Sequence, residues 1–127
     1  MIRILSLALS VIICSGCSIT TPAELRADHA LHSQLEVTDS LQTVVKNISN
    51  KANECGTPLS ENIAVLEELG EGRIEYRNHN NVIVMLVDLR RHNDKTRVTI
   101  YSRFKVFGWE KSFRTLEYGA KNLPGCP

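Results

Sequence analysis

The four cysteines are the residues of this 127-residue chain with the widest choice of chemistry. A thiol can form a disulfide, bind a metal, attack a substrate or accept a lipid. Cys14 and Cys17 end an apolar stretch near the N-terminus, whereas Cys55 and Cys126 lie far apart in the rest of the chain. Neither Cys55 nor Cys126 belongs to a C-x-x-C motif or has a histidine at metal-ligand spacing. The segments around the cysteines therefore decide between these reactions.

The first sixteen residues have the layout of a secretory signal. One cation, Arg3, precedes an apolar run from Ile4 to Ile13 that only two serines interrupt. A membrane-spanning helix needs roughly 20 apolar residues, so this run is too short to cross a bilayer. The small residues Ser15 and Gly16 stand directly before Cys17, as they do at a signal peptidase cleavage site.

The run from Ile13 to Cys17 resembles the lipobox of bacterial lipoproteins, which ends in two small residues and a cysteine. The resemblance implies that a diacylglyceryl group is attached to the thiol of Cys17 and that signal peptidase II removes residues 1–16. Cys14 departs from the family's pattern, which usually has an aliphatic residue there. By analogy with enterobacterial sorting, Ser18 favours the outer membrane, facing the periplasm. An ordinary cleaved signal and a short uncleaved anchor are the alternative interpretations.

If Cys14 leaves with the signal and Cys17 carries the lipid, two cysteines remain in an oxidising compartment. We therefore predict a structural disulfide between Cys55 and Cys126, with a redox pair or a metal site as the alternatives. Closing a loop of about 70 residues would stabilise the fold by roughly 4 kcal/mol in the loop-closure model. Such a cross-link suits a small domain, whose hydrophobic core is modest.

The charge balance excludes one class of partner. The chain has 15 basic and 14 acidic residues, and loss of Arg3 with the signal would leave it neutral. A neutral chain lacks the basic surface that nucleic-acid binding or a polybasic membrane contact requires. We therefore expect no nucleic-acid partner, and attachment to the membrane through the N-terminal lipid.

The chain after the signal divides into a tether and one domain. Residues 17–32 contain few apolar positions and are interpreted as a tether, either flexible or partly helical after Thr21 and Pro22. Residues 33–127 show the periodicities of a single small domain without internal repeats.

The domain is expected to contain two helices and three to five strands. Apolar residues at helical spacing predict helices over 39–54 and 109–120, the first begun by a capping box of Asp39 and Gln42. Strands are predicted over 33–37, 63–66, 73–77, 82–89 and 96–106, with a helical turn as the alternative for 63–66. This order predicts an α+β fold in which two helices pack on one face of an antiparallel meander sheet. The disulfide would hold the helices side by side.

The last predicted strand supplies a candidate partner-binding surface. Its alternation places three cations and an aromatic ring on one face, beside two cations of a neighbouring strand. These residues are Arg97, Tyr101, Arg103 and Lys105, with Arg73 and Arg77 beside them. Such a face suits an anionic glycan, a phosphate or an acidic partner. A solvated face with cross-strand pairs to acids such as Glu75 explains the same residues.

Two weaker candidates have simple structural alternatives. Aromatic residues around the start of the last helix would line a ligand groove between helix and sheet, or pack in the core. They are Phe104, Phe107, Trp109 and Phe113. His29 and His32 have the spacing of metal ligands on one helix face, but without a nearby cysteine we interpret them as solvated tether residues.

Known catalytic motifs are absent from the sequence. It contains no G-x-S-x-G elbow, no H-E-x-x-H motif and no phosphate-binding loop. We therefore expect a non-enzymatic, membrane-anchored periplasmic lipoprotein, with no metal or other cofactor, that binds or scaffolds an envelope protein or peptidoglycan. The alternative is a carrier or sensor of a small hydrophobic ligand, because a meander sheet closed by a C-terminal helix is similar to helix-grip lipid-binding folds.

Overall fold

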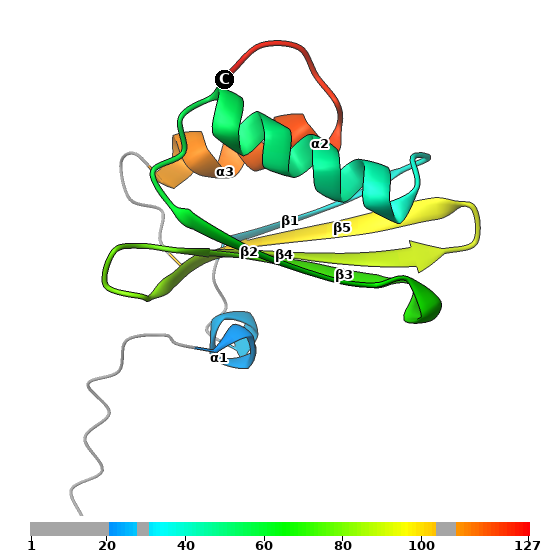
Figure 1. The fold of residues 1–127 in the computed structure, drawn as a ribbon, viewed down its shortest axis with the longest axis horizontal. Helices are drawn as coiled ribbons and strands as arrows, with labels where there is room; N and C mark the ends of the chain where they lie inside the picture. The colour runs from blue at the N-terminus through cyan, green and yellow to red at the C-terminus, as the bar shows by residue number, and fades with distance from the viewer. Residues whose placement is uncertain (1–20, 28–30, 104–108) are drawn as a thin grey trace, which may run out of the picture.

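A computed structural model describes residues 21–27, 31–103 and 109–127, except the side chains of Leu31, His32 and Trp109. A five-stranded antiparallel sheet carries two long helices on one face and one short helix on the other (Figure 1). The helices are α1 (Pro22–Ala27), α2 (Leu41–Glu54) and α3 (Trp109–Ala120). The strands are β1 (Leu31–Val37), β2 (Ser60–Leu66), β3 (Glu71–Arg77), β4 (Ile83–His92) and β5 (Lys95–Ser102), and a short 3-10 helix η1 (Glu67–Leu69) joins β2 to β3.

The sheet has the strand order β1-β5-β4-β3-β2, with every neighbouring pair antiparallel. Strands β2 to β5 form a meander, and β1 adds to its far edge beside β5. The predicted α+β meander with α2 and α3 on one face is therefore confirmed. Strand β4 is central and covered on both faces, which explains why its sequence is almost continuously apolar.

Helix α2 lies where the apolar periodicity predicts it, but its cap differs. The hydroxyl of Ser40 accepts a hydrogen bond from the Thr43 backbone N–H at 3.3 Å, so the predicted Asp39 cap is wrong by one residue. The backbone carbonyl of Asp39 instead accepts hydrogen bonds from the side chains of Arg91 and Thr96. These contacts attach the start of α2 to the end of the β4–β5 hairpin.

Helices α2 and α3 lie side by side and are cross-linked. A Cβ on Gly119 of α3 would stand 2.7 Å from the Ile48 Cα of α2, so only glycine permits this close approach. The predicted disulfide between Cys55 and Cys126 is present, with Cα atoms 5.7 Å apart. Beside it, the buried Lys51 ammonium donates a hydrogen bond to the Gly125 carbonyl at 3.0 Å. The C-terminal tail is thus held to the end of α2 by one covalent and one polar contact.

The predicted tether and the last strand both require correction. Residues 22–27 form α1, and its Leu25 is fully buried against Ile83 and Leu86 of β4. This part of the predicted 17–32 tether therefore packs on the domain, and β1 begins at Leu31 instead of residue 33. A single apolar side chain gives no periodicity from which such docking could be predicted. Strand β5 ends at Ser102, short of the predicted 106, and residues 104–108 lie outside the described residues.

Candidate functional site

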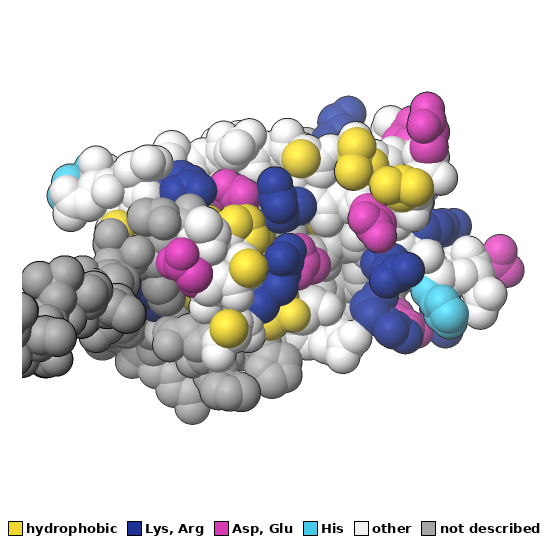
Figure 2. Space-filling model, turned by 90° about the horizontal axis from the view of Figure 1, so that it is seen from below, with side chains coloured by type: hydrophobic (Ala, Val, Ile, Leu, Met, Phe, Trp, Pro, Cys, Tyr) yellow, Lys and Arg dark blue, Asp and Glu magenta, His cyan; other side chains and the backbone are white. Residues whose placement is uncertain are grey.

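The face of the sheet opposite α2 and α3, which we term the open face, carries most of the charged strand residues. Figure 2 shows this face, with basic and acidic side chains intermixed across it. Strand register aligns the side chains in rows that cross the sheet. One row contains Leu66, Glu71, Arg90, Arg97 and Glu36, and the next contains Ala64, Arg73, Asp88, Thr99 and Gln34. Helix α1 covers only the part of this face around Leu86 and Tyr101.

The described members of the predicted partner-binding set, Arg97, Tyr101 and Arg103, lie on or beside this face but do not form a free cationic patch. Arg97 pairs with Glu36 of β1 at 3.1 Å, and Tyr101 packs beside Leu25 beneath α1. Arg103 follows β5 and donates its backbone N–H to the Val84 carbonyl. Lys105 lies outside the described residues.

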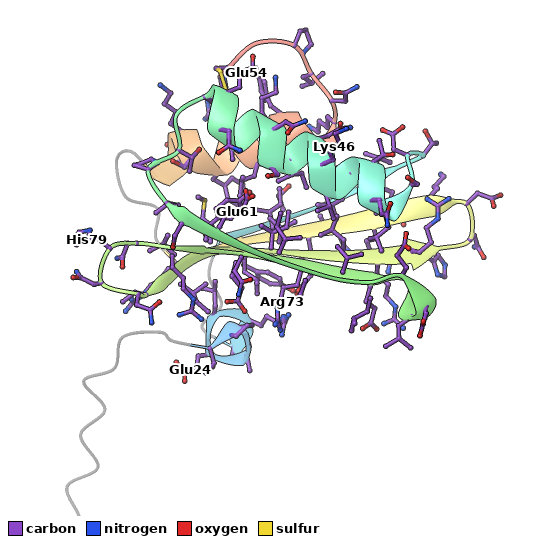
Figure 3. All side chains as sticks on the ribbon, in the orientation of Figure 1. Glu24, Lys46, Glu54, Glu61, Arg73 and His79 are labelled. Carbon is purple, nitrogen blue, oxygen red and sulfur yellow. A yellow bond between two sulfur atoms is a disulfide. The ribbon has the colours of Figure 1, made fainter. Side chains whose placement is uncertain are left out.

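Arg73 and Arg77 share one buried acid. The Glu75 carboxylate lies between them, 3.3 Å from Arg73 and 3.1 Å from Arg77, and its side chain is only 7% exposed. Figure 3 shows Arg73 on the side of the sheet away from α2 and α3. The pairing to Glu75 is the one that the solvated-face interpretation anticipated, although its partners lie on the same strand instead of across strands. Binding by Arg97, Tyr101, Arg103 and Lys105 stays a prediction.

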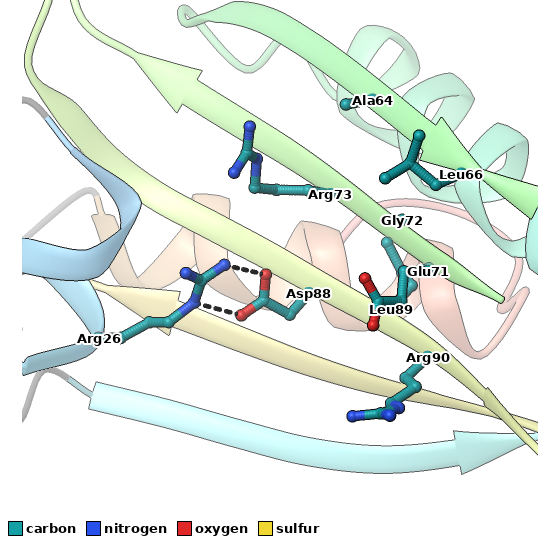
Figure 4. Close-up of a pocket in the computed structure, with 9 residues that line it drawn as sticks. All are labelled: Arg26, Ala64, Leu66, Glu71, Gly72, Arg73, Asp88, Leu89 and Arg90. Atoms are coloured by element: carbon teal, nitrogen blue, oxygen red, sulfur yellow. Dashed lines mark hydrogen bonds and ion pairs between the residues drawn. The ribbon is translucent and has the colours of Figure 1, made fainter. Parts of the chain in front are cut away.

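A hollow of about 370 Å³, which we term the open-face groove, lies between α1 and strands β2 to β4 (Figure 4). Its lining residues are Arg26, Ala64, Leu66, Glu71, Gly72, Arg73, Asp88, Leu89 and Arg90. Three guanidinium groups and two carboxylates thus surround apolar residues. Sequence reasoning missed the groove because α1 was assigned to the tether. The alternation of Glu71 and Arg73 along one strand was the available signal for one charged wall.

The two ends of the groove differ in how their charges are satisfied. Arg26 of α1 forms a two-point contact with Asp88, at 2.6 and 2.7 Å, and this hydrogen bonding raises the pKa of the Arg26 guanidinium. Arg90 and Glu71 are register partners, yet neither side chain makes a hydrogen bond or ion pair within the described part of the chain. Arg90 also lies directly opposite Arg97, a like-charge arrangement that is unfavourable without a counter-charge. The groove therefore presents one cation, Arg90, and one anion, Glu71, whose side chains have no partner in the described part of the chain.

On the helix-covered face, the buried Tyr76 anchors a polar cluster with the exposed Glu61 and the half-buried Ser49, and this cluster has a structural role. The Tyr76 hydroxyl donates to the Glu61 carboxylate at 2.8 Å, and the Ser49 hydroxyl of α2 donates to the same carboxylate. Burial, reinforced by the hydrogen bond to Glu61, raises the pKa of Tyr76 well above its usual value. The phenol stays protonated at neutral pH, so it fixes β2 to β3 instead of acting as a base.

The predicted aromatic ligand groove is only partly described. Phe113 is 6% exposed and belongs to the core between the helices and the sheet. Phe104 and Phe107 lie outside the described residues, as does the side chain of Trp109. The described core between α2, α3 and the sheet is filled by apolar side chains from both layers. The core-packing interpretation therefore holds for Phe113.

Within the described residues, no three histidine, cysteine, aspartate or glutamate side chains lie together as a metal site. His29 lies outside these residues, and the side chain of His32 is not described. None of the described helices has the length and apolar character needed to span a membrane. The chain matches no protein-family model, and no curated protein matches it significantly.

Proposed function

We propose that this protein is a lipid-anchored, non-enzymatic binding module of the bacterial cell envelope, and that the open-face groove contacts its partner. The observation that carries this proposal is the unpaired Arg90 and Glu71 on a face where the neighbouring charges are paired. A guanidinium and a carboxylate side by side complement a partner segment with charges of both signs. Exposed peptide segments of an envelope protein, or the stem peptides of peptidoglycan, have this character.

The lipobox-like sequence supports the anchor, and α1 limits its reach. Five residue steps separate Cys17 from Pro22, the first residue of α1. A chain of that length spans at most about 18 Å when fully extended. Because α1 packs on the open face, a lipid on Cys17 would keep the open-face groove close to the bilayer. The favoured partner is therefore a component at the surface of the same membrane.

A photocrosslinking amino acid at position 90 of the full chain tests the groove in intact cells. We expect a discrete crosslinked envelope component from this position. Lys46, exposed on α2 on the opposite side of the molecule (Figure 3), is the matched control and should give none. Treatment with a peptidoglycan hydrolase would shift a glycan-linked product but not a protein-linked one. Equal products from both positions, or none from either, would reject the groove as the contact site.

The anchor has its own test, which does not depend on the partner. Cys17→Ala should move the protein from the membrane fraction to the soluble fraction of the cell, because a lipid chain is the proposed attachment. A variant that stays in the membrane fraction would contradict the lipoprotein interpretation.

The carrier alternative receives less support, because the described helix–sheet interface is filled by side chains. Native mass spectrometry of the purified protein separates the two functions. A copurifying lipid bound by the domain would favour a carrier, whereas the mass of the chain and its anchor alone would favour a binding module.

A further inference from the structure

Strand β2 is an open edge of the sheet with an exposed apolar surface. Among the described strands it pairs with β3 alone, so its outer backbone N–H and C=O groups face away from that sheet. The most exposed large apolar side chains in the described chain belong to β2 and η1: Ile63 is 41%, Leu66 56% and Leu69 66% exposed. Leu66 lies in the open-face row of Glu71, whereas Ile63 lies in the row of Ile74 on the helix-covered side. Figure 2 shows apolar side chains gathered along one margin of the open face. Exposure of this kind at an edge strand marks a surface for pairing with another chain.

Strand β2 lacks the features that usually protect an edge. Its sequence from Ser60 to Leu66 contains no proline and no lysine, and its pairing with β3 runs without a register shift. Its single charge, Glu61, is engaged by Tyr76 and Ser49 on the helix-covered side. Within β2, a docking strand would therefore meet no proline, no lysine and no unpaired charge.

We propose that β2 pairs antiparallel with β2 of a second copy of this chain. Residues directly opposite in an antiparallel pair point to the same face. The register that pairs all seven residues of β2 sets Ser60 opposite Leu66 of the second copy and Ile63 opposite itself. Open-face residues then meet open-face residues, and helix-side residues meet helix-side residues. The two Ile63 side chains, which share the helix-covered side with Ile74, meet on the twofold axis. Such a self-complementary contact is the property that an isologous dimer requires.

The pairing is also compatible with a lipid anchor at Cys17 of each copy. This part of the argument rests on the proposed function. The twofold axis between antiparallel strands is perpendicular to the sheet, so both open faces and both copies of α1 lie on the same side. Two lipids attached at Cys17 could then enter one membrane. Because Ala64 and Leu66 line the open-face groove, the dimer would also bring the two grooves onto one continuous surface.

Charges at the two ends of β2 support the same pairing. The acidic η1 residues Glu67 and Glu68 follow the C-terminal end of β2. Arg77 lies opposite Ser60 at the other end and shares the single carboxylate of Glu75 with Arg73, so these three side chains keep one net positive charge. Antiparallel pairing brings the acidic end of one copy to the basic end of the other, twice by symmetry.

Site-specific oxidative crosslinking of the full chain in native membranes tests this register. Directly opposed residues have Cα atoms about 4.5–5.5 Å apart, which suits a disulfide. Ile63→Cys should therefore give a covalent dimer at least about tenfold more efficiently than Ser60→Cys, whose two copies would stand roughly 20 Å apart along the strands. Ser60→Cys and Leu66→Cys expressed together should crosslink to each other. The wild-type chain, with Cys55 and Cys126 already joined, should give no dimer.

Failure to crosslink through Ile63→Cys, or equal crosslinking through Ser60→Cys alone, would overturn the proposal. Ile63→Lys supplies a second measurement, because a lysine on an edge strand blocks pairing and this exposed site tolerates it in the fold. The wild type should sediment as a dimer in mild detergent and the variant as a folded monomer; a monomeric wild type would also overturn it. Partner crosslinking at position 90 is read separately, so a failed dimer and a failed partner contact remain distinguishable.

Discussion

The side chains on the two faces of the sheet are stabilised by different interactions. On the helix-covered face, Ile74, Val87, Val98 and Ile100 are fully buried against apolar side chains of α2 and α3. On the open face, the corresponding positions carry arginines and acids that pair along the strands, across them or with α1. Apolar burial contributes roughly 25 cal/mol per Å², whereas an exposed ion pair contributes only about 0–1 kcal/mol. Most of the folding free energy therefore comes from the helix-covered face. The residues of the open face contribute little to it and can serve contacts with a partner.

The largest effect is expected from the cross-link on the helix-covered side. Replacing Cys55 and Cys126 together by serine opens a loop with a sequence separation of 71 residues. We expect the free energy of unfolding to fall by about 4 kcal/mol, because the unfolded chain gains conformational freedom. Urea denaturation followed by circular dichroism measures the change. A loss below about 1 kcal/mol would show that the core and the contact of Lys51 with Gly125 are sufficient alone.

The sequence predicts the helix-covered side of the molecule much better than it predicts the open face. Helices α2 and α3 and strand β4 follow from strong local periodicity, and the disulfide follows from cysteine arithmetic. The Ser40 cap was missed because Asp39 is an equally good capping residue, and only the hydrogen bonds of its carbonyl to Arg91 and Thr96 decide between them.

The open-face groove could not be predicted, because it depends on contacts distant in sequence. Arg26 and Asp88 are 62 residues apart, and their pairing requires α1 to dock through Leu25 alone. Periodicity did place Arg73, Arg77, Arg97 and Tyr101 on one face. It offered Glu75 as a pairing acid but could not show that Arg73 and Arg77 share it or that Glu36 pairs with Arg97, because pairing depends on side-chain rotamers and strand register.

Replacing one buried aliphatic side chain by alanine on each side of the sheet compares the two faces directly. Ile48 of α2 and Leu25 of α1 are both fully buried. Ile48→Ala should lower the free energy of unfolding by about 3 kcal/mol, since it leaves a cavity in the main core. Leu25→Ala should cost only about 1 kcal/mol globally, because a short helix on a small satellite cluster can open locally. Hydrogen exchange should show faster exchange over residues 22–27 in Leu25→Ala alone; equal global losses would contradict the contrast.

Alkaline pH offers a reversible way to weaken the helix-covered side. The folded state raises the pKa of Tyr76 well above the value of about 10 that the unfolded chain has. Tyr76 therefore contributes its full stability below about pH 10, and above it the unfolded state loses the proton first. Stability should fall by about 1.4 kcal/mol per pH unit from this group. Tyr76→Phe should remove that part of the slope between about pH 10 and 11.5; identical slopes in both proteins would contradict the assignment.

The smallest effect is expected from the ion pair that closes the groove. Asp88→Asn removes the charge partner of Arg26, whose side chain is 38% exposed, so we expect a loss of stability below about 1 kcal/mol. Glu110→Gln is the matched control, because it breaks the more exposed pair with Arg114 on α3, far from the groove. The two variants should unfold at nearly the same urea concentration, but only Asp88→Asn should change crosslinking from position 90. A loss above about 2 kcal/mol in Asp88→Asn would mean that the open face also holds the fold together, because surface pairs alone contribute much less.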